Sequence, residues 1–571
     1  MSDSDKASYS KALQLLESAS DPPETPFKSK YEARAILESL LKHTQNQLHK
    51  ALITHHIALS HIHSQDASAG VTLLTSSVVP ILKSHAHIHE FALALQHAYN
   101  SLAIVNVGWE EVGRALEVLL ESERVYLLAK KAGIEPVDVL KESRPDISQE
   151  EEGHEGKGWK ALEEGYTKTV YFLAQVYGLI QGKDEKSAEY CLLTLKRQLN
   201  GYGGAINRLT WSLDCMTLSQ FYTERNAFDL GYQCLAAALQ MLSSIPIPDG
   251  QDVEEVDTLK RSIADLHWIQ GKFYLAIVKW IHDRDSDVIN DLSTSFKDLM
   301  TTPLFPTTTL PQPNPSNSLH RQQPLPPPPP YTSPPPKTSH AATPYFLASQ
   351  TSFTHATKYY SIANGHVSEY TDIIQDQSRL YKSLAAFHEL ATPKSALSLH
   401  EKRVTILESV AGTLNADKFG MLVKELVVEV ANAKESIVDC VQLIPGSERD
   451  VNSAVQSAIS AYKEVVRVYC GGETVPDEIG DEDDARAVFT AFVRMGVLWG
   501  KVSSGSGDVV SRSEDLRVVG LQKSLECYQV VNGYYIKHTA PEDFQDAVDF
   551  VRQMIPLLEK SLLALDKNPN T

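Results

Sequence analysis

Apolar residues recur along most of this chain at the spacing of an amphipathic helix. Between positions 31 and 41, for example, three- and four-residue steps place one set of apolar side chains on one helical face: Ala33, Ile36, Leu37, Leu40 and Leu41. The same period predicts helices over 91–104, 109–128, 211–221, 228–242, 353–362, 373–390, 421–433, 451–469 and 485–499. Segments that alternate cleanly between apolar and polar residues, as strands do, are absent. The sequence therefore predicts an all-α protein.

The predicted helices come in pairs whose residue sizes follow the tetratricopeptide (TPR) rhythm. In that rhythm small residues on both helices let the two backbones approach closely. The fullest match spans 211–221 and 228–242 and consists of Leu218, Ser219, Tyr222, Gly231, Leu235 and Ala238. Leu102-Ala103 begins a partial match, and so does Leu173-Ala174, where Ala188 comes two residues late and implies a longer turn. We therefore expect a TPR-like, right-handed α-solenoid of antiparallel helix pairs in two halves.

A proline-rich segment divides the pattern. Residues 301–340 hold 14 of the 29 prolines, and their only residues of the Lys, Arg, Asp and Glu types are Arg321 and Lys337. Because such a segment offers little apolar surface to bury, it predicts an extended, mobile linker. The predicted domains are an N-terminal helical solenoid over 1–300, the linker over 301–340 and a C-terminal helical solenoid over 341–571.

Charge and hydropathy narrow the classes of partner. The net charge of −19 disfavours nucleic acid, which is bound through Lys and Arg, and suits a basic protein partner. No run of about 18 apolar residues is evident, so membrane insertion is not expected. The polar first ten residues lack the apolar core of a signal peptide, which predicts a cytoplasmic protein.

Signatures of catalysis are missing from the sequence. There is no Gly-rich phosphate loop, no G-x-S-x-G and no H-E-x-x-H motif, so we expect neither an enzyme nor a cofactor or small-molecule substrate. Histidines gather at 55–56, 61–63 and 85–89, but no Cys, Asp or Glu joins them at a recurrent ligand spacing. The six cysteines are scattered through apolar helical patterns and are read as small core residues: Cys191, Cys215, Cys234, Cys440, Cys470 and Cys527. No metal site is predicted.

Several blocks of sequence resemble one known family. PFKSKYEARA over 26–35 is followed by FLAQVY over 172–177, YCLLTLKRQL over 190–199 and TLSQFY over 217–222. Beyond the proline-rich segment, QDQSRLYKSLAAF begins at 375 and KRVTILE at 402. In this order the blocks resemble the kinesin-binding protein family, and they span nearly the whole chain.

The resemblance implies an α-solenoid whose concave face grips a kinesin motor domain. The motor would be held around the helix that docks on the microtubule, so that its attachment is inhibited and microtubule-based transport is regulated. Family contact positions carry over to Phe172, Gln175, Gln198 and Thr217. Phe172 departs from the family, which typically has tyrosine there. The resemblance thus implies a cytoplasmic protein associated with the cytoskeleton.

Two other readings stay open on the sequence. One is a generic TPR adaptor or scaffold that binds peptide tails of other proteins. Such adaptors usually carry a clamp of basic residues that binds a carboxylate, and the net negative charge of this chain disfavours such a clamp. The other is a metal-dependent or nucleotide-using enzyme, which the missing motifs disfavour.

Overall fold

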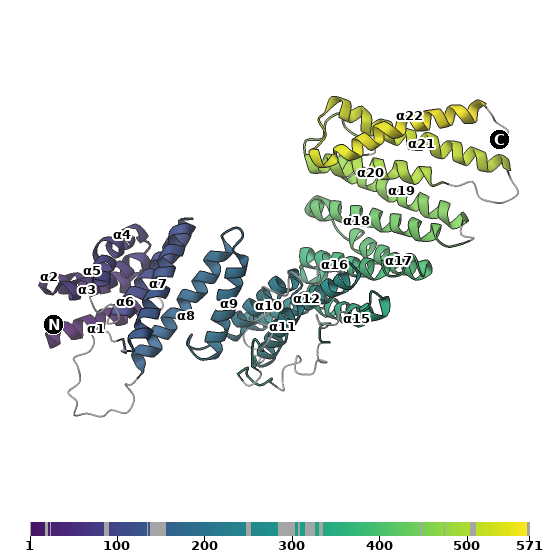
Figure 1. Ribbon diagram of the computed structural model, residues 1–571. Helices are drawn as coiled ribbons and strands as arrows, with labels where there is room; N and C mark the ends of the chain where they lie inside the picture. The colour runs from purple at the N-terminus through teal and green to yellow at the C-terminus, as the bar shows by residue number, and fades with distance from the viewer. Residues whose placement is uncertain are drawn as a thin grey trace. The chain divides into compact units, whose positions relative to one another are not determined.

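The computed structural model describes residues 2–17, 21–22, 24–84, 91–133, 135–136, 156–246, 253–283, 303–306, 309–314, 326–329, 335–445, 448–472, 474–502 and 510–567. Helices joined by turns make up this part of the chain, and none of its residues lies in a strand (Figure 1). Successive helices pack against each other, and short turns between packed neighbours make them antiparallel. The prediction of an all-α protein built from antiparallel helix pairs is confirmed.

The chain divides into two compact units. The first, unit 1, comprises Met1–Phe221, Ala236–Pro246 and Pro303–Arg321. The second, unit 2, comprises Tyr222–Leu235, Ile247–Thr302 and Gln322–Thr571. Two helices contribute residues to both units: α10 (Arg208–Glu224) and α11 (Phe228–Ser243).

Unit 1 begins with a series of nine helices in its described residues. They are α1 (Asp3–Glu17), α2 (Lys28–His43), α3 (Gln47–His63), α4 (Ala67–Leu73), α5 (Val79–Ser84), α6 (Ala92–Gly108), α7 (Val112–Ala132), α8 (Lys157–Gly178) and α9 (Asp184–Leu199). A π-helical turn, Leu74–Val78, joins α4 to α5. Packing runs from each helix to the next in the pairs α1–α2, α2–α3, α6–α7, α7–α8 and α8–α9.

Unit 2 continues the same arrangement. Its helices are α12 (Val253–Asp283), α15 (Ser339–Ala356), α16 (Val367–Ala385), α17 (Pro393–Ala411), α18 (Ala416–Gln442), α19 (Glu448–Cys470), α20 (Glu482–Gly500), α21 (Val510–Lys537) and α22 (Gln545–Lys567). Short 3-10 turns lie at Ile362–Asn364 and Glu542–Phe544. From α15 to α22 each helix packs on the next, and α12 packs on both α15 and α16.

Local sequence signals set several helix ends. Asn46 caps α3, because its Oδ1 accepts hydrogen bonds from the backbone N–H groups of Leu48 (2.8 Å) and His49 (3.2 Å). Gly133 ends α7 in the left-handed region at φ 69°, where glycine carries no Cβ penalty. Pro393 opens α17 at a position that needs no backbone N–H.

The predicted TPR register agrees with the burial of its residues. All six positions of the fullest match, from Leu218 to Ala238, are buried. In the partial matches, Ala103, Ala115 and Leu173 share one hydrophobic cluster, which joins α6, α7 and α8. The late Ala188 does follow a longer turn, since residues 179–183 separate α8 from α9. Small residues thus mark the helix crossings.

One segment of unit 1 is more apolar than expected. Residues 67–84 form a helical stretch long and apolar enough, by length and composition alone, to cross a membrane. Leu74, Val78 and Leu82 of this stretch are completely buried in the core that also contains Ile53 and Ile57 of α3. Only 22% of the stretch is buried, so one face of it packs on this core.

The division of the chain at the proline-rich segment stays a prediction, but the described part of this segment contains packed residues. Half of the predicted linker, namely residues 301–302, 307–308, 315–325 and 330–334, lies outside the described residues. In the described part, Leu304, Phe305 and Leu310 are buried, and the Phe305 ring meets Trp211 edge to face at 5.3 Å. The helices on either side of the segment, α12 and α15, pack together within unit 2. The described apolar residues among the prolines are therefore packed.

The predicted helix over 353–362 was placed too late in the chain. In the structure α15 starts at Ser339, where the Thr338 hydroxyl accepts from the N–H of Ala341, and it continues through Pro344 to Ala356. Tyr360 lies beyond the helix, is buried, and donates a hydrogen bond to Asp265 on α12. Tertiary packing therefore overrides the local apolar period at this point.

Candidate functional site

The candidate site lies on the α8–α9 hairpin and on the part of α10 that belongs to unit 1. Three of the predicted contact residues are on α8 and α9: Phe172, Gln175 and Gln198. The hairpin turns at Gly182, which has φ 74°, and the Ser187 hydroxyl donates to the Ala174 carbonyl at 2.7 Å across it. This bond fixes the beginning of α9 against the end of α8.

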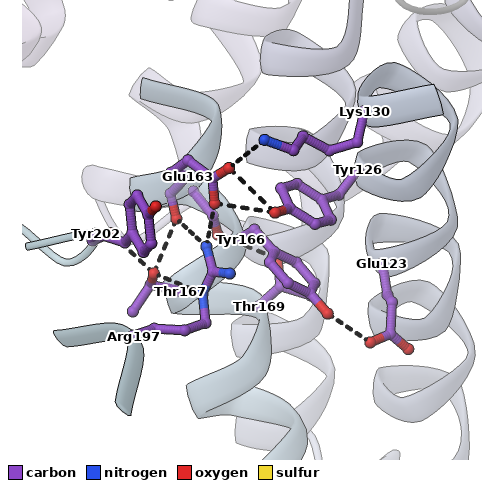
Figure 2. A network of polar contacts seen from close by, with 10 residues as sticks. Glu123, Tyr126, Lys130, Glu163, Tyr166, Thr167, Thr169, Arg197 and Tyr202 are labelled. Atoms are coloured by element: carbon purple, nitrogen blue, oxygen red, sulfur yellow. Dashed lines mark hydrogen bonds and ion pairs between the residues drawn. The ribbon is translucent and has the colours of Figure 1, made fainter. Parts of the chain in front are cut away.

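A buried ion pair fixes the other end of the hairpin (Figure 2). Arg197 on α9 donates from Nη2 to Oε2 of Glu163 on α8 at 2.5 Å, and Nη2 also reaches the Glu163 backbone carbonyl at 3.1 Å. Tyr126 and Lys130 of α7 donate to the same carboxylate, the hydroxyl to Oε2 at 2.9 Å and Nζ to Oε1 at 2.9 Å. One carboxylate therefore ties three successive helices together.

Aromatic rings surround the guanidinium of Arg197. Its Cζ lies 4.5 Å from the ring centre of Tyr166, 5.5 Å from that of Tyr126 and 5.3 Å from that of Tyr202. The Tyr126 and Tyr166 rings stack at 3.7 Å with an angle of 7° between their planes. A cation over aromatic faces is stabilised by the ring quadrupoles, and more so when it is desolvated. This environment holds Arg197 in one orientation.

The ionisable groups of this network shift each other's pKa values. Burial disfavours ionisation of Glu163, but hydrogen bonds from Lys130, Arg197 and Tyr126 outweigh it and hold the pKa of the carboxyl below its ordinary value. The hydrogen bond to Glu163 in turn raises the pKa of Lys130. Burial raises the pKa of Tyr126. The network is a closed structural unit, with its donors and acceptors matched to each other.

The turn after α9 is also held by this network. Thr167 on α8 donates from Oγ1 to the carbonyl of Tyr202 at 2.8 Å and accepts from Nε of Arg197 at 3.1 Å. A Cβ at Gly203 would lie 3.1 Å from Cγ of Gln198 and 3.4 Å from Cγ2 of Thr167. Glycine at this position lets the turn lie close against the two helices.

Gln175 and Thr217 are both exposed, as expected for residues outside the core. The Gln175 amide Nε2 donates to the Tyr171 hydroxyl at 2.7 Å, one turn earlier on α8. The Thr217 hydroxyl donates to the Leu213 carbonyl at 3.1 Å within α10. Both side chains are thus oriented by their own helix and present oxygens to an incoming donor. Whether they line one groove stays a prediction.

Phe172 and Gln198 are less exposed than Gln175 and Thr217. Phe172 is half-buried and packs against the cluster that contains Leu119, Leu173 and Val176. Gln198 is half-buried as well, and its Oε1 is covered, with no hydrogen-bond partner among the described residues. Part of each side chain therefore serves the helix packing.

Gln198 also lies at a different level of the hairpin from Gln175. Gln198 flanks Gly203 together with Thr167, and Thr167 precedes Gln175 by eight residues on α8. At about 1.5 Å per residue this corresponds to roughly 12 Å along the helix axis. That Gln198 reaches the same rim as Gln175 stays a prediction, and this spacing separates the two levels.

Two exposed leucines beside the candidate residues were not found from the sequence. Leu179, at the end of α8, is 60% exposed, and Leu213, one turn before Thr217, is 36% exposed. Asp214, which directly follows Leu213 in α10, is half-buried, and burial raises its pKa. Both leucines fit the apolar period of their helices, so periodicity alone assigns them to the core. Exposed apolar residues next to polar ones are typical of protein-binding surfaces.

The histidines do not form a metal centre in the part of the chain that the structure describes, where no group of three or more His, Cys, Asp or Glu is placed to hold an ion. His85, His87 and His89 lie outside the described residues. His55 is buried, and its ring lies 4.8 Å from that of His56 and 5.3 Å from that of His97. Burial lowers the pKa of His55 well below its ordinary value, so this ring is neutral at physiological pH.

Comparison with known proteins places the chain in a family. The family model described as "KIF-1 binding protein C terminal" matches residues 209–565, which is more than half of the chain. The chain belongs to this family. The resemblance read from the sequence blocks is therefore confirmed.

Relatives from distant animals align with almost the whole chain. The KIF-binding protein of Gallus gallus is 25% identical over 594 residues, covering 97% of this chain and 96% of that protein. The human protein of the same name is 25% identical, with coverage of 96% and 95%, and that of Drosophila melanogaster is 24% identical, with coverage of 97% and 95%. A solved circular tandem repeat protein covers 99% of this chain at 10% identity, but its TM-score of 0.25 carries no argument about the fold.

Proposed function

We propose that the protein binds kinesin motor domains and inhibits their attachment to microtubules, and so regulates microtubule-based transport in the cytoplasm. The observation that carries the proposal is the family match over residues 209–565, joined by relatives named KIF-binding protein that align with nearly the full chain. In this proposal the protein acts by occupying the motor surface, and no catalytic step is involved.

The contact surface is proposed on α8, α9 and α10. Gln175 and Thr217 supply exposed hydrogen-bonding groups, and Leu179 and Leu213 supply exposed apolar surface beside them. A few apolar anchors with neighbouring hydrogen bonds generally carry most of the affinity of a protein interface. Phe172 and Gln198 are half-buried, so in this proposal they contribute mainly through packing that positions the exposed residues.

The Arg197–Glu163 network supports the surface. It joins α7, α8 and α9 through buried, charge-assisted hydrogen bonds, so the hairpin that bears Gln175 is held before any partner arrives. Preorganisation of this kind reduces the entropy lost on binding.

Long-range attraction supports a kinesin partner as well. The chain carries a net charge of −19, whereas the surface of a kinesin that faces the acidic microtubule must be basic. Opposite charge on the two partners raises the association rate, and salt screens this effect. We therefore expect the association rate to fall as ionic strength rises, while the dissociation rate changes less.

The direct test measures binding of the full chain to a panel of recombinant kinesin motor domains by surface-immobilised interferometry at physiological salt. The proposal expects at least one motor domain to bind saturably and with one-to-one stoichiometry. Failure to bind any member of a panel that spans the kinesin families would overturn it.

A further inference from the structure

A charged cavity opens in unit 2, far along the chain from α8 to α10. Its volume is about 500 Å³, and α12, α16, α17 and α18 supply its walls. The charged groups that line it, apart from His282, are Lys279, Asp283, Arg379, Lys382, Arg403 and Glu429. Four cations thus face two carboxylates, in a protein whose overall net charge is −19. The cavity is a local exception to the acidic character of the chain.

Arg403 is the most deeply placed of these cations, since only 4% of its surface is exposed. Its Nε donates to the Ser378 hydroxyl at 3.3 Å, and its Nη1 donates to Nδ1 of His400 at 3.0 Å. Among the described residues no carboxylate lies within 4 Å of the guanidinium. Glu429 is coupled to it through Ser378, whose Oγ donates to Glu429 Oε2 at 3.2 Å. Arg403 is therefore a buried, permanently charged group, and its positive charge is not fully offset by a directly paired carboxylate.

The cavity carries two further uncompensated cations. Lys279 on α12 and Lys382 on α16 are exposed and form no ion pair with any described residue. Arg379, by contrast, pairs with Asp376 at 2.9 Å, and Asp283 is engaged by His282 at 2.6 Å. The unbalanced positive charge is thus concentrated on Lys279, Lys382 and Arg403, which come from three different helices.

We propose that this cavity binds a small soluble anion that carries several phosphate groups. Guanidinium and ammonium groups from separate helices converge on it, and Ser383 and Asn432 add neutral hydrogen-bonding groups to its lining. Arginine presents a planar fork that matches phosphate oxygens, and lysine adds point charges. The volume falls within the range of small-ligand sites, roughly 300–1,000 Å³. The site is independent of the proposed kinesin surface, because its residues belong to unit 2.

The test titrates the full-length protein with inositol hexakisphosphate, used as a probe, by calorimetry at physiological salt. Sodium sulfate at equal ionic strength controls for screening, and vesicles that contain a phosphoinositide form a separate arm. Saturable binding of the soluble probe, with a raised melting temperature that sulfate does not reproduce, supports the proposal. No binding of the soluble probe, or binding to the vesicles alone, overturns it.

Matched variants locate the binding. The double variant Lys279→Gln/Lys382→Gln removes two cations without breaking a described ion pair, so folding should be preserved. Because each charge-assisted contact typically accounts for about a tenfold change in affinity, the double variant should bind the probe at least roughly tenfold more weakly. The control Lys394→Gln/Lys418→Gln removes the same charge from exposed positions on α17 and α18 that do not line the cavity. Equal weakening in both double variants would show nonspecific attraction and contradict the proposed site.

Discussion

Arg197 and Glu163 lie 34 residues apart in the sequence, and their side chains meet in a buried ion pair of 2.5 Å. The two side chains are only 11% and 9% exposed. Since Glu163 also accepts from Tyr126 and Lys130, this pair is the point at which α7, α8 and α9 are joined. The sequence block that carries Arg197 was recognised from family resemblance, but the role of this residue lies in the fold.

Replacement of Arg197 by methionine should destabilise unit 1 strongly. The variant removes one of the two cations that pair with a buried carboxylate, and breaking a buried ion pair typically costs about 3–5 kcal/mol; because Lys130 still binds Glu163, we expect a loss near the lower end. Urea unfolding followed by circular dichroism measures the loss. Lys186→Met is the control, because Lys186 pairs with Glu189 at the surface, where such a pair contributes roughly 0–1 kcal/mol. Similar losses in the two variants would contradict the assigned importance of the network.

Acidification below neutral pH should destabilise the protein through His55. The folded-state pKa of His55 lies well below its ordinary value of 6.5, because burial penalises the charged ring. Stability is therefore fully present above pH 6.5 and declines as the pH falls below it. At pH 5 this one group should cost up to about 2 kcal/mol.

His55→Leu tests that assignment. Neither ring nitrogen of His55 has a hydrogen-bond partner in the described part of the chain, so leucine should be tolerated at neutral pH. The difference in unfolding free energy between pH 7.5 and pH 5 should shrink relative to the wild type. An unchanged difference would mean that His55 takes up no proton on unfolding in this range.

Phe305 should contribute to stability although it lies in the proline-rich segment. Its ring is buried and meets Trp211 edge to face, so Phe305→Ala removes both buried area and an aromatic contact. Truncation of a core phenylalanine costs about 3–5 kcal/mol, and we expect a value near the lower end for a residue outside a helix. Thermal unfolding measures the effect, with the exposed Thr309→Ala as the control. A melting temperature equal to that of Thr309→Ala would show that Phe305 does not stabilise the fold, as expected of an extended, mobile linker.

Helix identity could be read from the sequence because it depends on local periodicity. Leu218 and Gly231 were assigned to a helix crossing from side-chain size alone, and both are buried. Proline usually breaks a helix, yet Pro344 lies inside α15. There α12 and α15 pack so closely that a Cβ at Gly271 would lie 2.4 Å from the Phe353 ring. A contact between residues 82 positions apart cannot be detected from the periodicity of apolar residues in the sequence.

The candidate surface was predicted only in part, for a similar reason. Gln175 and Thr217 were expected to be exposed, and they are. That Gln198 shares their rim stays a prediction, and the close approach of Gly203 to its side chain could not be read from the sequence. The exposure of Leu179 and Leu213 depends on which neighbours the fold supplies, so helical period could not separate them from core leucines.

Removal of the two exposed polar groups should weaken the grip on a motor domain and leave the fold intact. In Gln175→Ala/Thr217→Ala each lost contact should cost on the order of 1 kcal/mol, so the affinity should fall by at least roughly tenfold in combination. Binding is measured by interferometry against a motor domain that the wild type holds. Gln377→Ala/Thr405→Ala is a control with the same chemistry in unit 2. If the α8–α10 variant binds as tightly as this control, the proposed contact surface is wrong even where the family function stands.

The most direct test of the proposed function counts single kinesin motors landing on microtubules in the presence of increasing amounts of the protein. For a motor domain that the protein binds in solution, the landing rate should fall toward zero, with half-inhibition near the measured dissociation constant. The run velocity of the motors that do land should stay unchanged, because a bound motor is masked and a free one is unaffected. A landing rate that stays constant while the motor is saturated with the protein would contradict the account.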